Sequence, residues 1–410
     1  MLRPRDCSGL NRVVALLKEK RIVVGVTGGV AAYKAADLVS SLRESGAVVK
    51  VVLTDAAQEF VQPLIFKALT GEEVYTGLFG GADPIPHVTL ARESDLLVVY
   101  PATANFIGQA AHGLAADLLT TLILAFKGPV VVCPAMNTRM FTNPAVQANL
   151  SKLGAYGYII VQPETGCLAC GEVGPGRLPA AATVLEVIRG ALVPKDLDGL
   201  TFLVTAGPTR EPIDPVRYLS NRSSGKMGYA VARAARDRGA RVVLVSGPTA
   251  LTKPFGVSCV DVNTAVEMRE AVLELFSTAD VVVMCAAVSD YRPKNILEQK
   301  IKKERQEFIQ EFIPNPDILE ELGRLKQNQL LIGFAAETEN ILDNARTKLE
   351  AKNLDFIVVN DVAQEGAGFE ADTNIVKILF RDGRFLELPR MDKYQVAQRL
   401  MDVISAMRNT

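Results

Sequence analysis

The chain has little histidine and no excess of charge of either sign. Only His87 and His112 occur in 410 residues, and 45 basic residues are balanced by 46 acidic ones. Binders of nucleic acid or membrane surfaces generally carry a basic excess, so we expect neither partner, although local basic clusters can bind small anions. No apolar run approaches the roughly 18 residues that span a membrane, and Met1–Lys20 lacks the apolar core of a signal peptide. The sequence therefore predicts a cytoplasmic protein.

Motifs for disulfides, zinc and dinucleotides are also missing. Six cysteines in a chain of this length do not make a disulfide scaffold. Cys167 and Cys170 form a CxxC pair without a second pair or neighbouring histidines, so a zinc site is not expected, and a redox pair remains an alternative. GxGxxG follows neither first strand of the two halves, which argues against a Rossmann dehydrogenase.

What is present is a repeated unit of a short apolar run, a Gly or Pro turn and a helix-like stretch. Continuous apolar runs suit parallel strands covered on both faces. Their alternation with helices predicts an α/β protein with two doubly wound, Rossmann-like domains, the first of them flavodoxin-like. The predicted strands are 22–26, 48–53, 96–100, 130–133 and 158–161, then 202–205, 242–246, 281–285, 330–334 and 356–360.

Residues 194–199 are polar and contain chain breakers, which predicts a linker. We therefore expect an N-terminal extension over 1–20, a first domain over 21–193 and a second over 200–410. Near the C-terminus, two apolar runs flank Asp382–Gly383. This pattern predicts a β-hairpin that adds antiparallel strands to the second sheet or reaches a partner subunit.

Glycine and polar residues follow three predicted strands of the first half. The turn Gly28–Ala31 offers backbone N–H groups at a helix start, which suits a phosphate, although a packing turn would look similar. Thr103 and Asn105 stand where doubly wound sheets bind ligands, and they also suit helix N-caps. Asn137 follows the next strand, where a buried amide can hold a carboxylate or stabilise a turn.

Two further features of the first half lie outside these strand ends. His87 follows the rigid segment Pro84-Ile85-Pro86, and a lone histidine is more often a structural group than a catalyst. Residues 170–178 contain three glycines and a proline, which predicts a flexible loop suited to a lid over a substrate.

Together and in this order, these segments resemble the flavin-dependent cysteine decarboxylases, which include phosphopantothenoylcysteine decarboxylase. The resemblance covers residues 21–193. Residues 134–140 match the PxMNxxMW signature up to its tryptophan, which is Phe141 here, and residues 170–178 match the substrate clamp. The resemblance implies FMN as cofactor and decarboxylation of 4'-phosphopantothenoylcysteine through a thioaldehyde, which accepts the electrons released as CO2 leaves.

The same resemblance assigns roles to individual residues. Asn137 would hold the substrate carboxylate, His87 would act as a base near the thiol, and Cys170 would supply a proton. The implied FMN contacts are Gly28, Gly29, Val30, Ala31, Thr54, Ala102, Thr103 and Asn105, and the implied substrate clamp is Met136, Gly171, Gly174, Gly176 and Arg177.

The second half carries an anion-binding pattern of a different kind. Residues 223–226 read SSGK but lack the GxxxxGK[ST] spacing of a P-loop; they suit an anion cradle or a serine-capped helix. Asp290 ends a predicted strand, where it can bind Mg2+ beside phosphates or cap a helix. Lys348 and Lys352 share one helical face, which suits a triphosphate or simply a soluble surface.

This half resembles phosphopantothenate–cysteine ligase across about residues 200–407, most specifically over 207–228. The bacterial, CTP-using form of that family is usually fused behind the decarboxylase. The resemblance implies that phosphopantothenate, cysteine and CTP react through an acyl-CMP, with Asn221 at the carboxylate and Lys300 offsetting transition-state charge. The implied nucleotide contacts are Gly207, Ser223, Ser224, Gly225, Lys226, Ala286, Asp290, Lys300, Pro316, Asp317, Ile318, Leu319, Phe334, Lys348 and Lys352, with Asp290 also a Mg2+ ligand.

One rival interpretation is a regulatory flavoprotein that has lost catalysis and acts through partners. The joint presence of His87, Asn137 and Cys170 favours an enzyme. The resemblance further implies a homo-oligomer, since the decarboxylases form trimers that share each flavin site and the ligases form dimers. A chain with both would build a closed assembly, a dodecamer.

Overall fold

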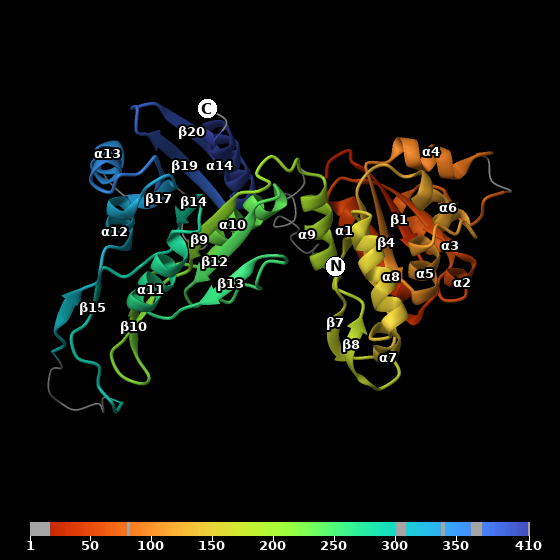
Figure 1. Ribbon diagram of the computed structural model, residues 1–410, viewed down its shortest axis with the longest axis horizontal. Coiled ribbons are helices and arrows are strands. Elements are labelled where there is room, and N and C mark those ends of the chain that lie inside the picture. The colour runs from red at the N-terminus through yellow and green to blue at the C-terminus, as the bar shows by residue number, and fades with distance from the viewer. Residues whose placement is uncertain (1–16, 80–82, 301–308, 338–340, 362–370, 409–410) are drawn as a thin grey trace, which may run out of the picture. The chain divides into compact units, whose positions relative to one another are not determined.

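Figure 1 shows the computed structural model, which describes residues 17–79, 83–300, 309–337, 341–361 and 371–408. The chain divides into two compact units, Met1–Val193 and Pro194–Thr410. Of the predicted N-terminal extension, residues 1–16 lie outside the described part. Within the described ranges, no helix is both long and apolar enough to cross a membrane.

The first unit is built on a six-stranded parallel sheet in the order β3-β2-β1-β4-β5-β6. The strands are β1 (Arg21–Val26), β2 (Val48–Leu53), β3 (Val74–Tyr75), β4 (Leu96–Ala102), β5 (Val130–Pro134) and β6 (Ile159–Ile160). The doubly wound sheet is thus confirmed, with the Rossmann strand order rather than the flavodoxin order 2-1-3-4-5. The order reverses between β1 and β4, which opens a crevice at their carboxyl ends.

Helices cover both faces of this sheet. On one face, α4, α5, α6 and α8 pack against β-branched residues of β1, β4 and β5 in one apolar cluster. On the other, α1 packs against α3 and α9. The helices are η2 (Val30–Lys34), α1 (Ala35–Glu44), α2 (Asp55–Gln58), α3 (Pro63–Thr70), α4 (Pro86–Glu93), α5 (Ala104–Ala111), α6 (Leu118–Ala125), α7 (Thr138–Phe141), α8 (Pro144–Ala155) and α9 (Ala181–Ala191).

The predicted flexible loop at residues 170–178 is instead half of a β-hairpin. Strands β7 (Glu164–Cys167) and β8 (Val173–Arg177) pair antiparallel, and the turn between them closes through Leu168 N to Glu172 O at 2.8 Å. Two of its glycines, Gly174 and Gly176, allow close approach to neighbouring residues. A Cβ at Gly174 would lie 2.6 Å from Thr138 Oγ1, and one at Gly176 would collide with the carbonyl oxygen of Met136.

The second unit has an eight-stranded sheet in the order β13-β12-β9-β14-β17-β18-β19-β20. The first six are parallel and repeat the 3-2-1-4-5-6 order; β19 and β20 are antiparallel additions, which confirms the predicted C-terminal hairpin. Its strands are β9 (Thr201–Ala206), β12 (Arg241–Ser246), β13 (Ser258–Asp261), β14 (Val281–Met284), β17 (Leu330–Glu337), β18 (Phe356–Asp361), β19 (Thr373–Phe380) and β20 (Phe385–Asp392).

Two apolar clusters sandwich this sheet. Helices α10 (Lys226–Asp237) and α14 (Lys393–Arg408) cover one face, and α11 (Ala265–Phe276), α12 (Ile318–Leu325) and α13 (Ile341–Ala351) cover the other. Two small antiparallel ladders join β10 (Arg210–Pro212) to β11 (Tyr218–Ser220) and β15 (Tyr291–Pro293) to β16 (Phe312–Pro314). The sequence did not predict these ladders, because a strand of three residues is too short to show an alternation of apolar and polar residues.

The predicted linker at 194–199 packs against the second unit. Leu197 is buried at 1% exposure in the cluster under α10 and α14. Lys195 Nζ donates to Asp237 O, and Arg238 pairs with Asp196. The polar side chains of this segment are thus used in contacts with the second unit. Residues 194–199 pack as the first turn of that unit.

Candidate functional sites

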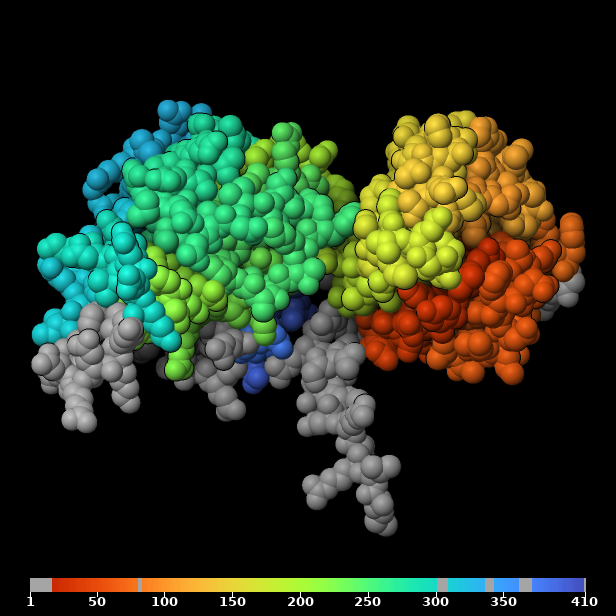
Figure 2. Space-filling model, turned by 90° about the horizontal axis from the view of Figure 1, so that it is seen from below, coloured from red at the N-terminus to blue at the C-terminus, as the bar shows by residue number. Residues whose placement is uncertain are grey.

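The first unit has a cleft of about 870 Å³ at the crevice between β1 and β4. Three strand ends and the β7–β8 hairpin supply its walls, and Figure 2 shows the hairpin segment on the surface beside the N-terminal segment coloured red. Ten predicted site residues line the cleft together: Gly28, Gly29, Val30, Ala31, Thr103, Met136, Asn137, Cys170, Gly176 and Arg177.

The glycine turn after β1 is shaped by close packing. A Cβ at Gly28 would collide with Ala56, whereas one at Gly29 would meet only Thr103 Cγ2 at 3.6 Å. The turn leads directly into η2, and the cleft is lined both by the turn and by the first residues of η2, Val30 and Ala31. Both readings of the turn, packing and anion binding, are therefore compatible with its geometry.

Asn137 and Cys170 meet inside this cleft from different elements. Asn137 caps α7, because its Oδ1 accepts a hydrogen bond from Arg139 N at 2.8 Å. That bond aims Nδ2 at Cys170 Sγ, 3.3 Å away, and at Glu172 Oε2, 2.7 Å away. The hairpin is held against the same strand end by Met136 N donating to Gly176 O at 3.0 Å. Glu172 was not predicted as a site residue.

Other predicted flavin and clamp residues lie next to the cleft without lining it. Thr54 caps α2 by accepting from Ala57 N, and Ala102 is fully buried at the end of β4. Asn105 accepts from Gln109 Nε2 on α5. Gly171 lies in the hairpin turn with a φ of 83°, and Gly174 packs on Thr138.

His87 is placed elsewhere in the unit. It lies in the first turn of α4, and α4 stands at the opposite end of the unit from the β7–β8 hairpin (Figure 1). Its Nδ1 is buried and has no hydrogen-bond partner among the described residues. Within one chain, His87 is therefore not brought together with Asn137 and Cys170.

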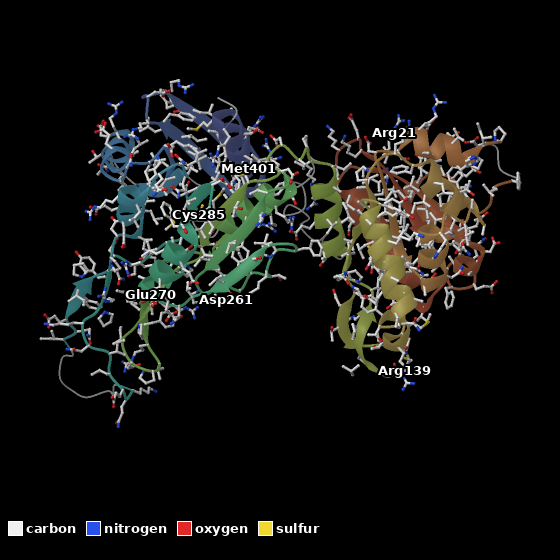
Figure 3. All side chains as sticks on the ribbon, viewed as in Figure 1. Arg21, Arg139, Asp261, Glu270, Cys285 and Met401 are labelled. Carbon is white, nitrogen blue, oxygen red and sulfur yellow. The ribbon has the colours of Figure 1, made fainter. Side chains whose placement is uncertain are left out.

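The second unit has a cleft of about 460 Å³ at the carboxyl ends of its central strands. Thirteen predicted residues line it: Asn221, Ser223, Gly225, Lys226, Ala286, Asp290, Pro316, Asp317, Ile318, Leu319, Phe334, Lys348 and Lys352. Cys285, labelled in Figure 3, lies in the same wall after β14, where burial raises the pKa of its thiol. Gly207, Ser224 and Lys300 are not among the lining residues.

Glycines set the floor of this cleft. Gly225 has a φ of 76° and begins α10, and Gly207 has a φ of 75° directly beneath it. A Cβ at Gly228 would lie 2.7 Å from Thr205 O, so α10 approaches β9 closely. The start of α10 thus points into the cleft, as an anion site at a helix N-terminus requires.

Polar side chains on the walls are held by backbone carbonyls and ion pairs. Asn221 Nδ2 donates to Val288 O at 2.9 Å. Lys352 Nζ pairs with Asp317 Oδ2 at 2.7 Å, and Lys226 Nζ pairs with Asp372 Oδ1 at 2.7 Å. Asp317 and Asp372 thus pair with two of the lysines that line the cleft.

Sequence reasoning missed Asn360, Asn374 and Lys393 in this cleft. Lys393 is 6% exposed, and burial, reinforced by the charge of Lys226, lowers its pKa to about 8. Asn374 is 3% exposed, and its Oδ1 has no hydrogen-bond partner among the described residues. A buried lysine at a helix start directly after an antiparallel strand has no signature in the sequence, so only the fold identifies it.

The described residues contain no group of three or more His, Cys, Asp or Glu side chains that could hold a metal ion. A protein-only metal centre is therefore not found in this part of the chain. Asp290 and Asp317 line the second cleft, and Asp317 is paired with Lys352, an arrangement that suits Mg2+ held mainly by phosphates.

Two α/β units, each with a cleft at the point where its strand order reverses, define a ligand-binding enzyme architecture of the doubly wound class. The family model Flavoprotein matches residues 11–193, and the model for the DNA/pantothenate metabolism flavoprotein C-terminal domain matches residues 197–407. The first unit is thus a flavoprotein domain.

Curated relatives match almost the whole chain. The coenzyme A biosynthesis bifunctional protein CoaBC of Bacillus subtilis is 47% identical over 398 residues, covering 96% of this chain and 98% of that protein. CoaBC of Escherichia coli strain K12 is 44% identical over 395 residues, covering 95% and 97%. The crystal structure of a CoaBC C-terminal domain is 45% identical, covers 52% of this chain and 98% of that chain, and has a TM-score of 0.46. This chain belongs to the family of bifunctional coenzyme A biosynthesis enzymes, which join a decarboxylase flavoprotein unit to a ligase unit.

Proposed function

We propose that the first unit decarboxylates 4'-phosphopantothenoylcysteine with FMN, and that the second makes this substrate from phosphopantothenate, cysteine and CTP. The observation that carries the proposal is the convergence of Asn137 and Cys170 in the cleft over Gly28–Ala31. An amide donor, a thiol and a glycine turn at one sheet edge supply a carboxylate contact, a proton donor and a phosphate cradle.

The residues of the first cleft fit FMN. The glycine turn at Gly28 and Gly29 and the helix start at η2 suit its phosphate, and Val30, Met136 and Leu178 offer apolar surface for a ring system. Bound FMN would supply the two-electron oxidation and reduction that this decarboxylation needs.

The chain's own groups then orient the substrate and move protons. Asn137 Nδ2 donates to the substrate carboxylate and keeps it beside Cys170 Sγ until CO2 leaves. Cys170 gives a proton to the decarboxylated product; it stands on the hairpin turn and is exposed to the cleft. Met136, Gly176 and Arg177 close the wall around the cysteine end of the substrate.

His87 acts on the thiol in an oligomer. Since α4 and the β7–β8 hairpin stand at opposite ends of one unit (Figure 1), we propose that His87 of one chain completes the cleft of a neighbouring chain. The buried Nδ1, which has no hydrogen-bond partner among the residues that the structure describes, fits a histidine whose role is fulfilled only in the assembly. Trimers of the first unit and dimers of the second would then combine in a dodecamer.

In the second cleft, phosphopantothenate and CTP would meet at the start of α10. Attack of the substrate carboxylate on the α-phosphate releases pyrophosphate and forms an acyl-CMP, which the amine of cysteine then opens, releasing CMP. Lys226, Lys348 and Lys352 offset phosphate charge, and Lys300 would add a cation from outside the described walls. Mg2+ would be held by Asp290 together with the phosphates.

The test is to incubate the full chain with FMN, phosphopantothenate, cysteine and Mg2+, with either CTP or ATP, and to identify the products by mass. We expect 4'-phosphopantetheine, CO2, CMP and pyrophosphate with CTP. Supplied phosphopantothenoylcysteine should be decarboxylated without nucleotide. A chain that binds FMN but forms neither product would be the regulatory flavoprotein instead.

A further inference from the structure

Glu172 accepts a hydrogen bond from the side-chain amide of Asn137, the group that is assigned to the substrate carboxylate. Its Oε2 accepts from Asn137 Nδ2 at 2.7 Å, while Cys170 Sγ lies 3.3 Å from the same nitrogen. A carboxamide nitrogen has two hydrogens, so both are used. The amide cannot turn over to offer more, because its oxygen accepts from Arg139 N at the start of α7.

The hairpin turn holds Glu172 in this position. Its own carbonyl accepts from Leu168 N at 2.8 Å, which closes the turn, and Val173 begins β8 directly after it. The side chain is 42% exposed, so it lies at the surface and not in the core. It can leave Asn137 without unfolding the hairpin.

A receiving group for the displaced carboxylate is present. Arg139 Nε lies 3.9 Å from Glu172 Oε1, and the arginine side chain is 90% exposed. Figure 3 shows Arg139 at the lower end of the unit, near the β7–β8 hairpin. An exposed pair at this distance is weak, so the hydrogen bond to Asn137 is the stronger of the two contacts.

We propose that Glu172 is a gating residue, whose carboxylate takes the place of the substrate carboxylate on Asn137 and exchanges with it on binding. The inference rests on the proposed role of Asn137 in holding that carboxylate. Two carboxylates cannot share one amide nitrogen at close range, because like charges repel strongly away from water. Substrate therefore enters as Glu172 moves to Arg139, and once CO2 has left, Glu172 can return to Asn137.

The exchange lowers the apparent affinity for any ligand that carries the carboxylate. The intrinsic affinity is multiplied by the fraction of chains in which Asn137 does not bind Glu172. Glu172→Ala removes the competitor entirely. Glu172→Gln keeps a hydrogen-bond acceptor but removes the charge. We expect KM for phosphopantothenoylcysteine to fall about three- to tenfold in Glu172→Ala and less in Glu172→Gln.

The control is Glu59→Gln, which changes an exposed carboxylate at the end of α2 that does not line the cleft. Its KM should match the parent. Arg139→Ala removes the receiving group and should raise KM, the direction opposite to Glu172→Ala.

Binding without turnover gives the second measurement. The FMN-loaded full chain is titrated with phosphopantothenoylserine, which has the carboxylate but no thiol, and with 4'-phosphopantetheine, which has no carboxylate, and flavin absorbance reports occupancy of the first cleft. Glu172→Ala should tighten binding of the first ligand about three- to tenfold and leave that of the second unchanged. Equal shifts for both ligands, or weaker binding of the first, would overturn the gate. A parent chain that neither binds these ligands nor decarboxylates substrate would instead refute the proposed function.

Discussion

Lys352 Nζ lies 2.7 Å from Asp317 Oδ2 in the wall of the second cleft. Burial alone would raise the pKa of the Asp317 carboxyl, but hydrogen bonds from Lys352 and from the backbone N–H groups of Glu320 and Leu319 outweigh it, and the pKa lies below its usual value. Asp317 also caps α12 by accepting from Glu320 N at 3.0 Å. One carboxylate thus stabilises a helix start and positions a lysine of the cleft.

Replacing Asp317 should separate these two roles. Asp317→Asn keeps an N-cap and loses the ion pair, which should cost up to about 1 kcal/mol at a partly exposed site. Asp317→Ala loses the cap as well, for about 1 kcal/mol more. Because the folded pKa is depressed, the ion-pair contribution is present above about pH 4 and is lost as the pH falls through the folded value. Urea unfolding of the full chain at pH 7 and pH 3 checks this, and an Asp317→Asn difference that is unchanged at pH 3 would contradict it.

Gly176→Ala should disable the first cleft without unfolding the unit. Gly176 has a φ of 135°, and a Cβ there would strike Met136 O, so the hydrogen bond from Met136 N to Gly176 O is lost and the hairpin moves away from Asn137. We expect decarboxylation to fall at least about tenfold. Gly113→Ala is the matched control: its φ is 68° and its Cβ meets nothing within 4 Å, so it carries left-handed strain of about 1 kcal/mol alone. Equal activity losses in both variants would refute the role of the hairpin.

Subunit sharing predicts complementation between two inactive variants. His87→Asn and Cys170→Ser should each abolish product formation, His87→Asn while keeping FMN. When both chains are mixed by co-expression, a neighbouring pair can combine an intact His87 with an intact Cys170. Random mixing in trimers restores about one quarter of the sites. Decarboxylation by the mixed assembly measures this, and complete absence of recovered activity in mixed trimers would place both residues in one chain.

Asn221→Asp should damage the second activity and leave the first intact. Asn221 Nδ2 donates to Val288 O at 2.9 Å, so an aspartate would set its charge against that carbonyl and against the substrate carboxylate. Lys300→Gln should lower pyrophosphate release from CTP about a hundredfold, as loss of one transition-state contact does. Decarboxylation of supplied phosphopantothenoylcysteine should continue at the parent rate. Loss of decarboxylation in a folded, assembled variant would count against two separate sites.

Lys393 should make stability depend on pH in the alkaline range. Burial lowers its pKa to about 8 in the folded chain, whereas an unfolded lysine titrates near about 10.4. Between these values the unfolded state binds more protons, so stability rises with pH through this window, by up to about 3 kcal/mol. Lys393→Met removes that rise. Unfolding curves of both chains from pH 7.5 to 10 should therefore diverge, and parallel curves would show that the lysine keeps its ordinary pKa.

The strands could be predicted from the sequence because burial on both faces demands continuous apolar runs. Val281–Met284 is such a run and forms a central strand, β14. Short strands could not be predicted, because a strand such as Val74–Tyr75 contains too few residues to show a pattern. Leu197 was assigned to a linker because its neighbours are polar, and only the pairing of those neighbours with Asp237 and Arg238 explains its burial.

The sequence by itself determined which residues stand at the ligand edges, since the residues after parallel strands must meet at one side of a sheet. Gly28, Thr103 and Asn137 line one cleft for that reason. The tertiary structure alone decided that Glu172 binds Asn137, that Lys393 is buried beside Lys226, and that His87 stands apart from Cys170. These relationships depend on how a hairpin, an added antiparallel strand and a helix pack against the sheet, and such long-range packing is not encoded in any local spacing of residues.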